Sequence, residues 1–483
     1  MPTMSEEHLP LMTKFAQPRR TALKSLASGF GYLAFAEMAQ REAARASGKT
    51  DSELAPKPTH FAPKAKRVIF LCMNGGPSHV DLFDHKPQLE KKAESKTAKN
   101  GPRMMPSPFE FARHGESGLW FSEVCPNVAQ HADDICMIHS MQTELPNHSQ
   151  AFIQLHTGSF QFTRPSMGAW TVYGLGTENT DLPGFITLNP PSDNGGARNY
   201  GTSFLPSIFQ ATKIGTNQIP RFYAKLMGVD QEPGPPLKNI RNSKISTQRQ
   251  RQQLDLIREL NSFKLKRDVH HPEVEGAIET FELAFRMQNS VPALLDLKGE
   301  TQATFKSYGI GSGLPTDRFG RQCLLARRMT EAGVRFIELT APVGWDHHFD
   351  LKGNLAESCA ATDQPVAALL TDLKRRDMLK DTLVIWAGEF GRTPYAQSGT
   401  GRDHNNKGFT IWLAGGGVRG GMSYGATDEF GHKAVENPVS IHDWHATILH
   451  LLGLDHERLT FNYAGRDFRL TDVYGDVVHE IIS

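Results

Sequence analysis

The sequence has almost no excess of charge of either sign. It carries 53 Lys and Arg residues against 52 Asp and Glu residues, which leaves a formal net charge of +1 over 483 positions. A nucleic-acid-binding surface needs clustered Lys and Arg, so this balance argues against a nucleic-acid partner. The basic run at residues 247–253 lies within a helical pattern and is interpreted as a solvated helix face.

The sequence also lacks closely spaced cysteines. Its five cysteines show no C-x-x-C spacing of the kind that holds zinc, and their odd number leaves one over in any disulfide framework. Cys72 falls inside a predicted strand, where a thiol behaves as a small apolar side chain. The cysteine content therefore leaves the compartment of the protein open.

Long apolar runs are missing too, and no segment offers the roughly 20 apolar residues that cross a membrane. The N-terminal region instead joins Arg19 and Arg20 to a short stretch, residues 26–36, that is rich in Gly and Ala. The pattern Arg-Arg-x-x-Leu-Lys resembles a twin-arginine export signal, with Ala22 in place of the common Phe. We expect a signal at residues 1–45, a linker at 46–66, contact with the twin-arginine export machinery, and a periplasmic or extracellular protein. A surface amphipathic helix is the alternative.

Continuous apolar runs are typical of strands buried on both faces, as in a parallel sheet. The chain contains four of them, at residues 68–73, 334–339, 382–387 and 409–414. Helical periodicity lies between these runs and after the last one, most clearly at residues 361–381 and 440–454. This alternation predicts a three-layer α/β/α sandwich with a mostly parallel central sheet, in which ligands bind at the carboxyl ends of the strands.

Residues 190–300 differ from this pattern. Their first part is rich in Pro, Gly and Asn, and two helical patterns follow at residues 246–266 and 272–289. Apolar residues recur at every third position of the first pattern, which suggests a helical hairpin. We interpret the segment as an insertion in a single domain that spans residues 67–483.

Polar residues follow the buried strands. Zn²⁺ and Mn²⁺ accept mixed nitrogen and oxygen ligands, so carboxylates and imidazoles that converge from several strand ends favour a divalent metal site. Asp346, His348 and His404 are predicted as its core, and a hydrogen-bonded loop cluster is the alternative. The strand-end residues are Asn74, Ser78, His79, Asp81, Asp346, His347, His348, Asp350, Glu389, Arg392, Asp403 and His404, and the segment 144–159 adds Asn147, His148, Ser149 and His156.

The order of motifs resembles a known group of proteins. Seven stretches carry the likeness: MNGGPSHVDLFDHKP, NHSQAFIQLHTGS, PSMGAWTVYGLG, GWDHHFD, TLVIWAGEFGRTP, GRDHNNKGFTIWLAGGGVRGG and AGRDFRLTDVYG. Together they resemble an uncharacterised bacterial family, a domain of unknown function, of twin-arginine-exported and sulfatase-like proteins in the alkaline phosphatase superfamily. The match runs from about residue 67 to 478, which implies a sulfatase-like fold for nearly the whole mature chain.

The resemblance also implies which metal ligands survive. The superfamily holds one metal with an Asp-x-x-x-His pair, approximated here by the segment WDHH, and with a late histidine that corresponds to His404. The second metal site keeps Glu389, whereas Phe390 and Asn74 stand where the superfamily has His and Asp. We expect one divalent ion rather than two, with Zn, Mn, Ca and Mg all open. The candidate metal ligands are Asp346, His348, His404, Glu389 and Asp81.

The nucleophile is the largest departure from the superfamily. His148 stands at the position where a sulfatase has Cys or Ser, and Cys125 and Cys136 lack the Cys-x-Pro-x-Arg context of formylglycine formation. Water activated by the metal would then attack, with Glu389 or His148 as the general base. Arg392 would stabilise the oxyanion, or it would form a salt bridge that fixes its own loop. The candidate anion-binding residues are Arg392, Asn74, Ser78 and His79.

These expectations describe an exported metal-dependent hydrolase of a sulfate or phosphate ester, on a small molecule or a polysaccharide. The alternative is a non-catalytic descendant of the scaffold that binds a metal, a glycan or an exported partner protein. The missing nucleophile favours this alternative, and the dense polar cluster disfavours it, because buried charges are costly without a role. A metal-dependent mutase or isomerase is the third hypothesis.

Overall fold

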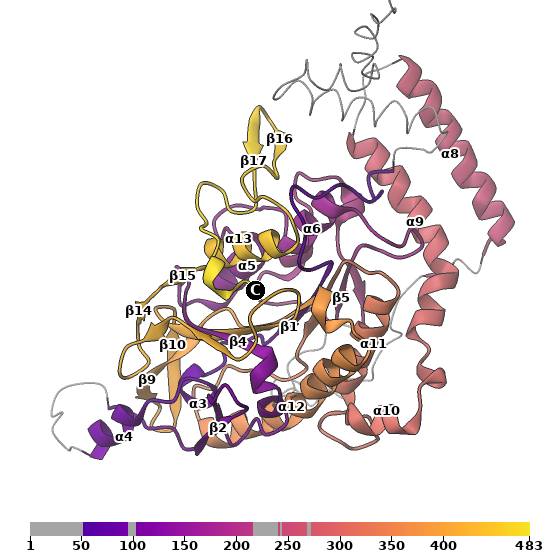
Figure 1. The fold of residues 1–483 in the computed structure, drawn as a ribbon. Coiled ribbons are helices and arrows are strands. Elements are labelled where there is room, and N and C mark those ends of the chain that lie inside the picture. Colours follow the sequence, from indigo (N-terminus) through magenta and orange to yellow (C-terminus); the bar gives the residue numbers. More distant parts are fainter. Residues whose placement is uncertain (1–51, 95–102, 216–239, 242–243, 268–271) are drawn as a thin grey trace, which may run out of the picture. The chain divides into compact units, whose positions relative to one another are not determined.

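The computed structural model describes residues 52–483 except for 95–102, 216–239, 242–243 and 268–271 (Figure 1). The predicted export signal lies outside the described residues. Residues 53–483 form one structural unit. No helix within the described part of the chain has the length and apolar character needed to span a bilayer.

A nine-stranded sheet lies at the centre of this unit, in the order β12, β4, β11, β8, β1, β7, β5 and β6, with β15 also paired to β4. Its strands are β1 (Arg67–Cys72), β4 (Ile135–Gln142), β5 (Phe185–Leu188), β6 (Thr212–Ile214), β7 (Phe336–Thr340), β8 (Thr382–Ala387), β11 (Phe409–Ala414), β12 (Met422–Tyr424) and β15 (Val439–Ser440). Pairings within the sheet are parallel except for those of β11. The predicted α/β fold with a mostly parallel sheet is confirmed.

Two of the predicted strands, 382–387 and 409–414, coincide with β8 and β11. The sheet is mostly rather than wholly parallel, because β11 runs antiparallel to both β8 and β4. A continuous apolar run reports burial on both faces, and it does not report the direction of the strand. The reversal follows from the hairpin of β9 (Gly391–Gln397) and β10 (Gly401–Asn405), which lies between β8 and β11 in the chain.

The pairing register of the central strands shows which side chains point to one face of the sheet. Phe70 of β1 is paired with Glu338 of β7 and Ile385 of β8, so these three side chains point to the same side. The Phe70 ring packs there against Trp444 of α13 (Ile441–Leu451) and His156 of α5 (His148–Thr157), with ring centroids 5.9 and 5.7 Å apart. Helices α5 and α13 therefore cover this face.

The opposite face is covered by α11 (Asp317–Glu331) and α12 (Leu351–Arg375), which pack against each other. Trp386 of β8 and Trp412 of β11, paired in register, line a small internal void with Val366 of α12. Figure 1 shows α5, α6 and α13 on one side of the labelled strands β1, β4 and β5, and α11 and α12 on the other. The three-layer α/β/α arrangement is confirmed.

The remaining elements lie around this sandwich. The helices are α3 (His79–Leu82), α4 (Pro87–Glu94), α6 (Met167–Leu175), α8 (Thr247–Arg267), α9 (Pro272–Leu295) and α10 (Gln302–Ser307). The 3₁₀ turns are η1 (Val128–Asp134), η2 (Gly196–Tyr200), η3 (Ser207–Phe209), η4 (Leu297–Gly299), η5 (Leu379–Asp381) and η6 (His479–Ile481). Short hairpins pair β2 (Phe111–His114) with β3 (Leu119–Ser122), β13 (Ala426–Thr427) with β14 (Ala434–Glu436), and β16 (Phe461–Tyr463) with β17 (Arg466–Phe468).

The two helical patterns expected at 246–266 and 272–289 are present as α8 and α9, and α9 continues to Leu295. Arg251 and Arg258 of α8 both pair with Glu282 of α9, at 2.5 and 2.7 Å, so the two helices contact each other.

The described part of the predicted linker also has contacts. The Lys57 N–H donates to the Leu175 carbonyl and the Lys64 N–H to the Leu451 carbonyl, at 2.9 and 2.8 Å.

Candidate metal centre

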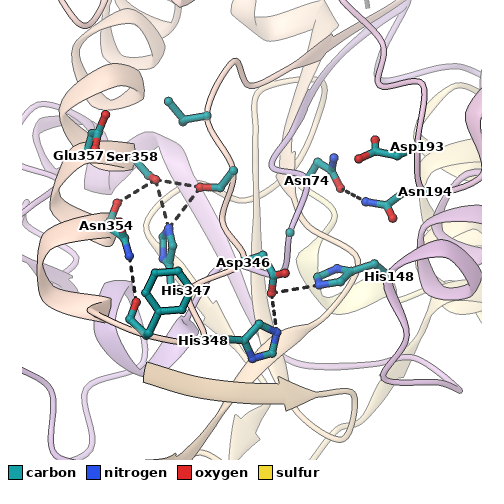
Figure 2. Close-up of a pocket in the computed structure, with 14 residues that line it drawn as sticks. Asn74, His148, Asp193, Asn194, Asp346, His347, His348, Asn354, Glu357 and Ser358 are labelled. Carbon is teal, nitrogen blue, oxygen red and sulfur yellow. Dashed lines mark hydrogen bonds and ion pairs between the residues drawn. The ribbon is translucent and has the colours of Figure 1, made fainter. Parts of the chain in front are cut away.

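Four side chains meet near the sheet: His148 at the start of α5, Asp346 and His348 on the loop after β7, and His404 in β10. One ligand atom of each lies within 4.8 Å of the others. The Nε2 atoms of His148, His348 and His404 lie 3.1, 2.9 and 3.4 Å from Oδ1 of Asp346. Figure 2 shows Asp346 between His148 and His348, with its carboxylate directed at both. The structure thus brings together Asp346, His348 and His404, and His148 joins them.

Each of the three imidazoles is held from behind through Nδ1. His148 Nδ1 lies 2.6 Å from Glu389 Oε1 and His404 Nδ1 lies 2.8 Å from the Pro146 carbonyl oxygen. His348 Nδ1 contacts Oε1 of Gln397. In a neutral ring, an oxygen acceptor at Nδ1 favours the tautomer that carries its proton there, which leaves the lone pair of Nε2 for the group. Metal-binding histidines in proteins show this arrangement almost always.

The group, hereafter the His₃Asp group, is open on one side. The Asp346 side chain is 45% exposed and that of His148 is 18% exposed. A cavity of about 480 Å³ adjoins them, and Figure 2 shows its lining residues. Structural zinc sites are closed by four protein ligands, whereas catalytic sites keep a position for water or substrate. The His₃Asp group has four candidate ligands, the number of a structural site, and the cavity beside it leaves space for a water or substrate as a fifth ligand.

Glu389 lies behind the group rather than within it. Its side chain is fully buried, and its carboxylate accepts hydrogen bonds from the N–H groups of Gly75 and Gly76, at 3.0 to 3.3 Å. Gly75 adopts a φ of +119°, and a Cβ at that position would lie 2.7 Å from the backbone nitrogen of Asp346. The loop after β1 can therefore approach both Glu389 and Asp346 because it carries glycine there.

Arg392 is fully buried and does not reach the cavity. Its guanidinium donates to the carbonyl oxygens of Gly76 (2.8 Å) and Arg402 (3.2 Å), and to Oδ1 of Asp346 (2.5 Å). Of the two interpretations of Arg392, the geometry fits the salt bridge that fixes a loop. Since it donates to Oδ1 of Asp346, the same oxygen that the three Nε2 atoms approach, Arg392 is a positioning residue for the His₃Asp group.

Asp81, Ser78 and His79 lie apart from the His₃Asp group. Both oxygens of Asp81 accept from Arg402, at 2.7 and 2.9 Å, and the Ser78 hydroxyl also donates to Asp81. His79 Nε2 lies 2.7 Å from the Gly431 carbonyl oxygen. Residues 79–82 form the short helix α3, which packs against β9, and none of the three residues lines the cavity. The structure therefore places Asp81 in an ion pair with Arg402 and does not place it among the four clustered ligands.

The charges around the group favour a cation between its ligand atoms. Burial lowers the pKa of His148, but its hydrogen bonds to Asp346 and Glu389 outweigh this and raise the pKa to about 9. Burial raises the pKa of Asp346, yet hydrogen bonds from His148 and His404 and the Arg392 charge hold it well below its usual range. Either a proton or a metal ion supplies the positive charge that these ligands stabilise.

Several residues of the site carried no signal in the sequence. Gln397 and the Pro146 carbonyl are such residues, and both contact the group. Phe390, which the sequence singled out as the replacement of a histidine, packs its ring against His148 and His404, with centroids 4.8 and 4.6 Å apart. A metal-binding histidine is expected to have an acceptor at its second nitrogen, but the sequence does not say which residue supplies it. Asn74 lines the cavity and accepts from Asn194 Nδ2 at 2.9 Å.

The fold and the site define the class of the protein: it is an α/β protein with a half-open group of three imidazoles and a carboxylate that could hold a metal ion. The chain belongs to the DUF1501 family, described as a protein of unknown function, because residues 65–482 match the model of that family. No curated protein matches the sequence.

Solved structures similar to this chain include a synthase, a sulfatase and an alkaline phosphatase. The lipoteichoic acid synthase LtaP from Listeria monocytogenes is 10% identical, with a TM-score of 0.35, and the match covers 86% of this chain and 78% of that one. The PsFucS1 sulfatase from Pseudoalteromonas sp. is 12% identical, with a TM-score of 0.35 and coverage of 82% and 68%. The alkaline phosphatase from the Antarctic bacterium TAB5 is 11% identical, with a TM-score of 0.30 and coverage of 81% and 98%.

Proposed function

We propose that the protein is a metal-dependent hydrolase in which His148, Asp346, His348 and His404 hold one divalent ion. The observation that carries this proposal is the convergence of three Nε2 atoms on Asp346, each imidazole being anchored through Nδ1, beside an open cavity. Three nitrogen ligands and one oxygen ligand suit Zn²⁺ or Mn²⁺, whereas Mg²⁺ and Ca²⁺ prefer oxygen ligands throughout. Zn²⁺ and Mn²⁺ are therefore the ions to test first.

The residues of the chain have separate tasks in this proposal. A divalent ion supplies electrophilic activation of water and of an ester oxygen. Glu389 holds the His148 ring in its orientation and acts on the reaction only through that ring. Arg392 holds Asp346. Asn74 and Asp193 lie on one side of the cavity and Glu357 on the other, where a bound substrate would meet them (Figure 2).

The substrate proposed is a sulfate or phosphate ester, on a small molecule or a polysaccharide, met in the periplasm or outside the cell after twin-arginine export. The motif order of the chain supports this choice. A second candidate function is non-catalytic binding of a glycan or of an exported partner protein. It is supported by His148, which occupies the place of an oxygen nucleophile and points into the metal group instead.

Metal analysis tests the site. The purified full-length protein is expected to contain about one equivalent of Zn²⁺ or Mn²⁺, and His404→Ala combined with Asp346→Ala is expected to remove it. The exposed His479 lies outside the group, so His479→Ala serves as the control and should retain the ion. Less than about a tenth of an equivalent after reconstitution would overturn the proposal.

Activity is tested on the metal-replete protein with aryl sulfates, phosphate monoesters and phosphate diesters. Turnover of one class, lost in His404→Ala and kept in His479→Ala, is the expected result. A protein that holds its ion and hydrolyses none of the three classes contradicts the hydrolase and supports the binding function.

A further inference from the structure

Two thiols lie side by side in the core although they are far apart in the sequence. The Sγ atoms of Cys125 and Cys359 are 3.8 Å apart across a sequence separation of 234 residues. Both are free thiols, 7% and 1% exposed. Cys125 lies just before η1, and Cys359 belongs to α12, the helix that also lines the site cavity with Asn354 and Ser358.

We propose that Cys125 and Cys359 are a modification site at which a low-molecular-weight disulfide, such as oxidised glutathione, forms an intramolecular disulfide. One cysteine thiolate attacks a sulfur of the small disulfide, which releases one small thiol and leaves a mixed disulfide. The second cysteine then attacks the mixed disulfide and releases the second small thiol. The two protein thiols are oxidised to one S–S bond, and the small disulfide is reduced to two thiols.

The surroundings of the pair allow the bond to form. An S–S bond of about 2.05 Å requires the sulfur atoms to approach each other by about 1.8 Å. A void of about 20 Å³ borders Cys125, with Val128, Thr362 and Asp363 in its lining, and gives the side chain room to rotate. The other three cysteines lie in separate elements, Cys72 in β1, Cys136 in β4 and Cys323 in α11, and serve as internal references.

The bond would reinforce a contact that already exists. Asp363, one turn after Cys359 on α12, accepts hydrogen bonds from the N–H groups of Asn127 and Val128 at 2.9 and 2.8 Å. A disulfide at Cys125 would fasten the same segment to α12 covalently and brace one wall of the cavity. Because the closed loop is very long, the loss of freedom in the unfolded chain is large, and the gain in stability should lie in the upper part of the usual range.

The rate of the reaction has a structural limit. The hydrogen bond to Cys359, together with burial, raises the pKa of the Cys125 thiol, so little thiolate is present in the folded protein. Exchange then proceeds when the segment before η1 opens locally. The modification is therefore expected over hours rather than seconds.

The test uses the full chain under native conditions, incubated with excess oxidised glutathione or with dithiothreitol, then alkylated and digested. The expected result is a pair of joined peptides that contain Cys125 and Cys359, with a mass lower than their sum by two hydrogen atoms. The midpoint of thermal unfolding should rise by about 3 °C or more in the oxidised sample. Cys323→Ser should behave like the parent protein, and Cys359→Ser should show neither the joined peptides nor the shift.

Three results would overturn the proposal: five alkylated thiols after long oxidation, a stable glutathione adduct on either cysteine, or the same thermal shift in Cys359→Ser. Metal content is measured in parallel. Because the pair lies outside the His₃Asp group, one ion per chain is expected in both redox states, and the fate of this proposal is independent of the hydrolase function.

Discussion

His148 Nδ1 lies 2.6 Å from Glu389 Oε1, and this contact joins the His₃Asp group to the segment that follows strand β8. The Glu389 carboxylate is held in turn by the N–H groups of Gly75 and Gly76, so it cannot rotate away. The imidazole is therefore fixed with Nε2 toward Asp346. His148 is thereby fixed as one of the four side chains of the His₃Asp group.

The first prediction concerns Glu389. Glu389→Gln keeps an oxygen acceptor for His148 but removes the negative charge that makes the imidazole a stronger ligand. We expect the affinity for the ion to fall by about 10- to 100-fold while the stoichiometry at saturation stays at one. A competition titration with a chromophoric chelator measures both quantities. An unchanged affinity would remove Glu389 from any role behind His148.

The second prediction contrasts two buried arginines. Arg392→Lys breaks the fork of hydrogen bonds to the loop after β1 and to Asp346, so both stability and metal affinity should decrease. Arg402→Lys is the matched control, because Arg402 is equally buried and pairs with Asp81. It should lower the free energy of unfolding, because Lys keeps the charge but cannot reproduce the paired hydrogen bonds to both Asp81 oxygens, and leave metal affinity unchanged. Equal effects of the two variants on metal affinity would contradict the positioning role of Arg392.

The third prediction concerns Asp81 itself. Asp81→Asn leaves the Arg402 charge buried and unpaired, which should cost about 3 to 5 kcal/mol of stability. Urea unfolding with the metal removed measures this loss. Metal content of the folded variant should equal that of the parent protein. A variant that unfolds normally but no longer binds the ion would restore Asp81 as a ligand.

The fourth prediction follows from His79. Burial is the largest cause that lowers the pKa of this imidazole, from an ordinary value of 6.5 to about 4. The folded state thus favours the neutral ring, whereas the unfolded state takes up a proton below pH 6.5. The stability of the protein is therefore unaffected by protonation of His79 above pH 6.5 and decreases as the pH falls from 6.5 towards 4. The loss amounts to about 3 kcal/mol at pH 4.

The variant His79→Gln cannot take up this proton. Its unfolding free energy, measured by urea titration of the metal-free protein between pH 7 and 4.5, should therefore fall less steeply than that of the parent protein. The exposed His479 again supplies the control, since His479→Ala should follow the parent curve. Parallel curves for His79→Gln and the parent protein would show that His79 is not a neutral buried group.

Much of the fold could be predicted because burial leaves a direct mark on the sequence. Strands β8 and β11 are buried along their whole length, and their boundaries match their apolar runs. The direction of β11 left no such mark, since it depends on how the β9–β10 hairpin turns the chain between the two strands. The strand β4, which contains His139, Ser140 and Gln142 beside its apolar residues, was not predicted.

The site was predictable in composition but not in geometry. Asp346, His348 and His404 could be grouped because carboxylates and imidazoles that follow neighbouring strands meet at one edge of a sheet. Whether Arg392 faces a substrate or a backbone loop depends on burial, and Arg392 proves to be fully enclosed. The partner of His348, Gln397, depends on the register of β9 and β10, which no local pattern of residues specifies.

The distance between His148 and His404 along the chain has a consequence for folding. His148 follows β4, His404 precedes β11, and the two strands are paired, with Ile138 opposite Ile411. The two histidines can meet only after a strand from the last quarter of the chain has paired with one from the first third. Under the proposed metal-binding function, capture of the ion would therefore be a late event in folding, and a bound ion would oppose the separation of β4 from β11.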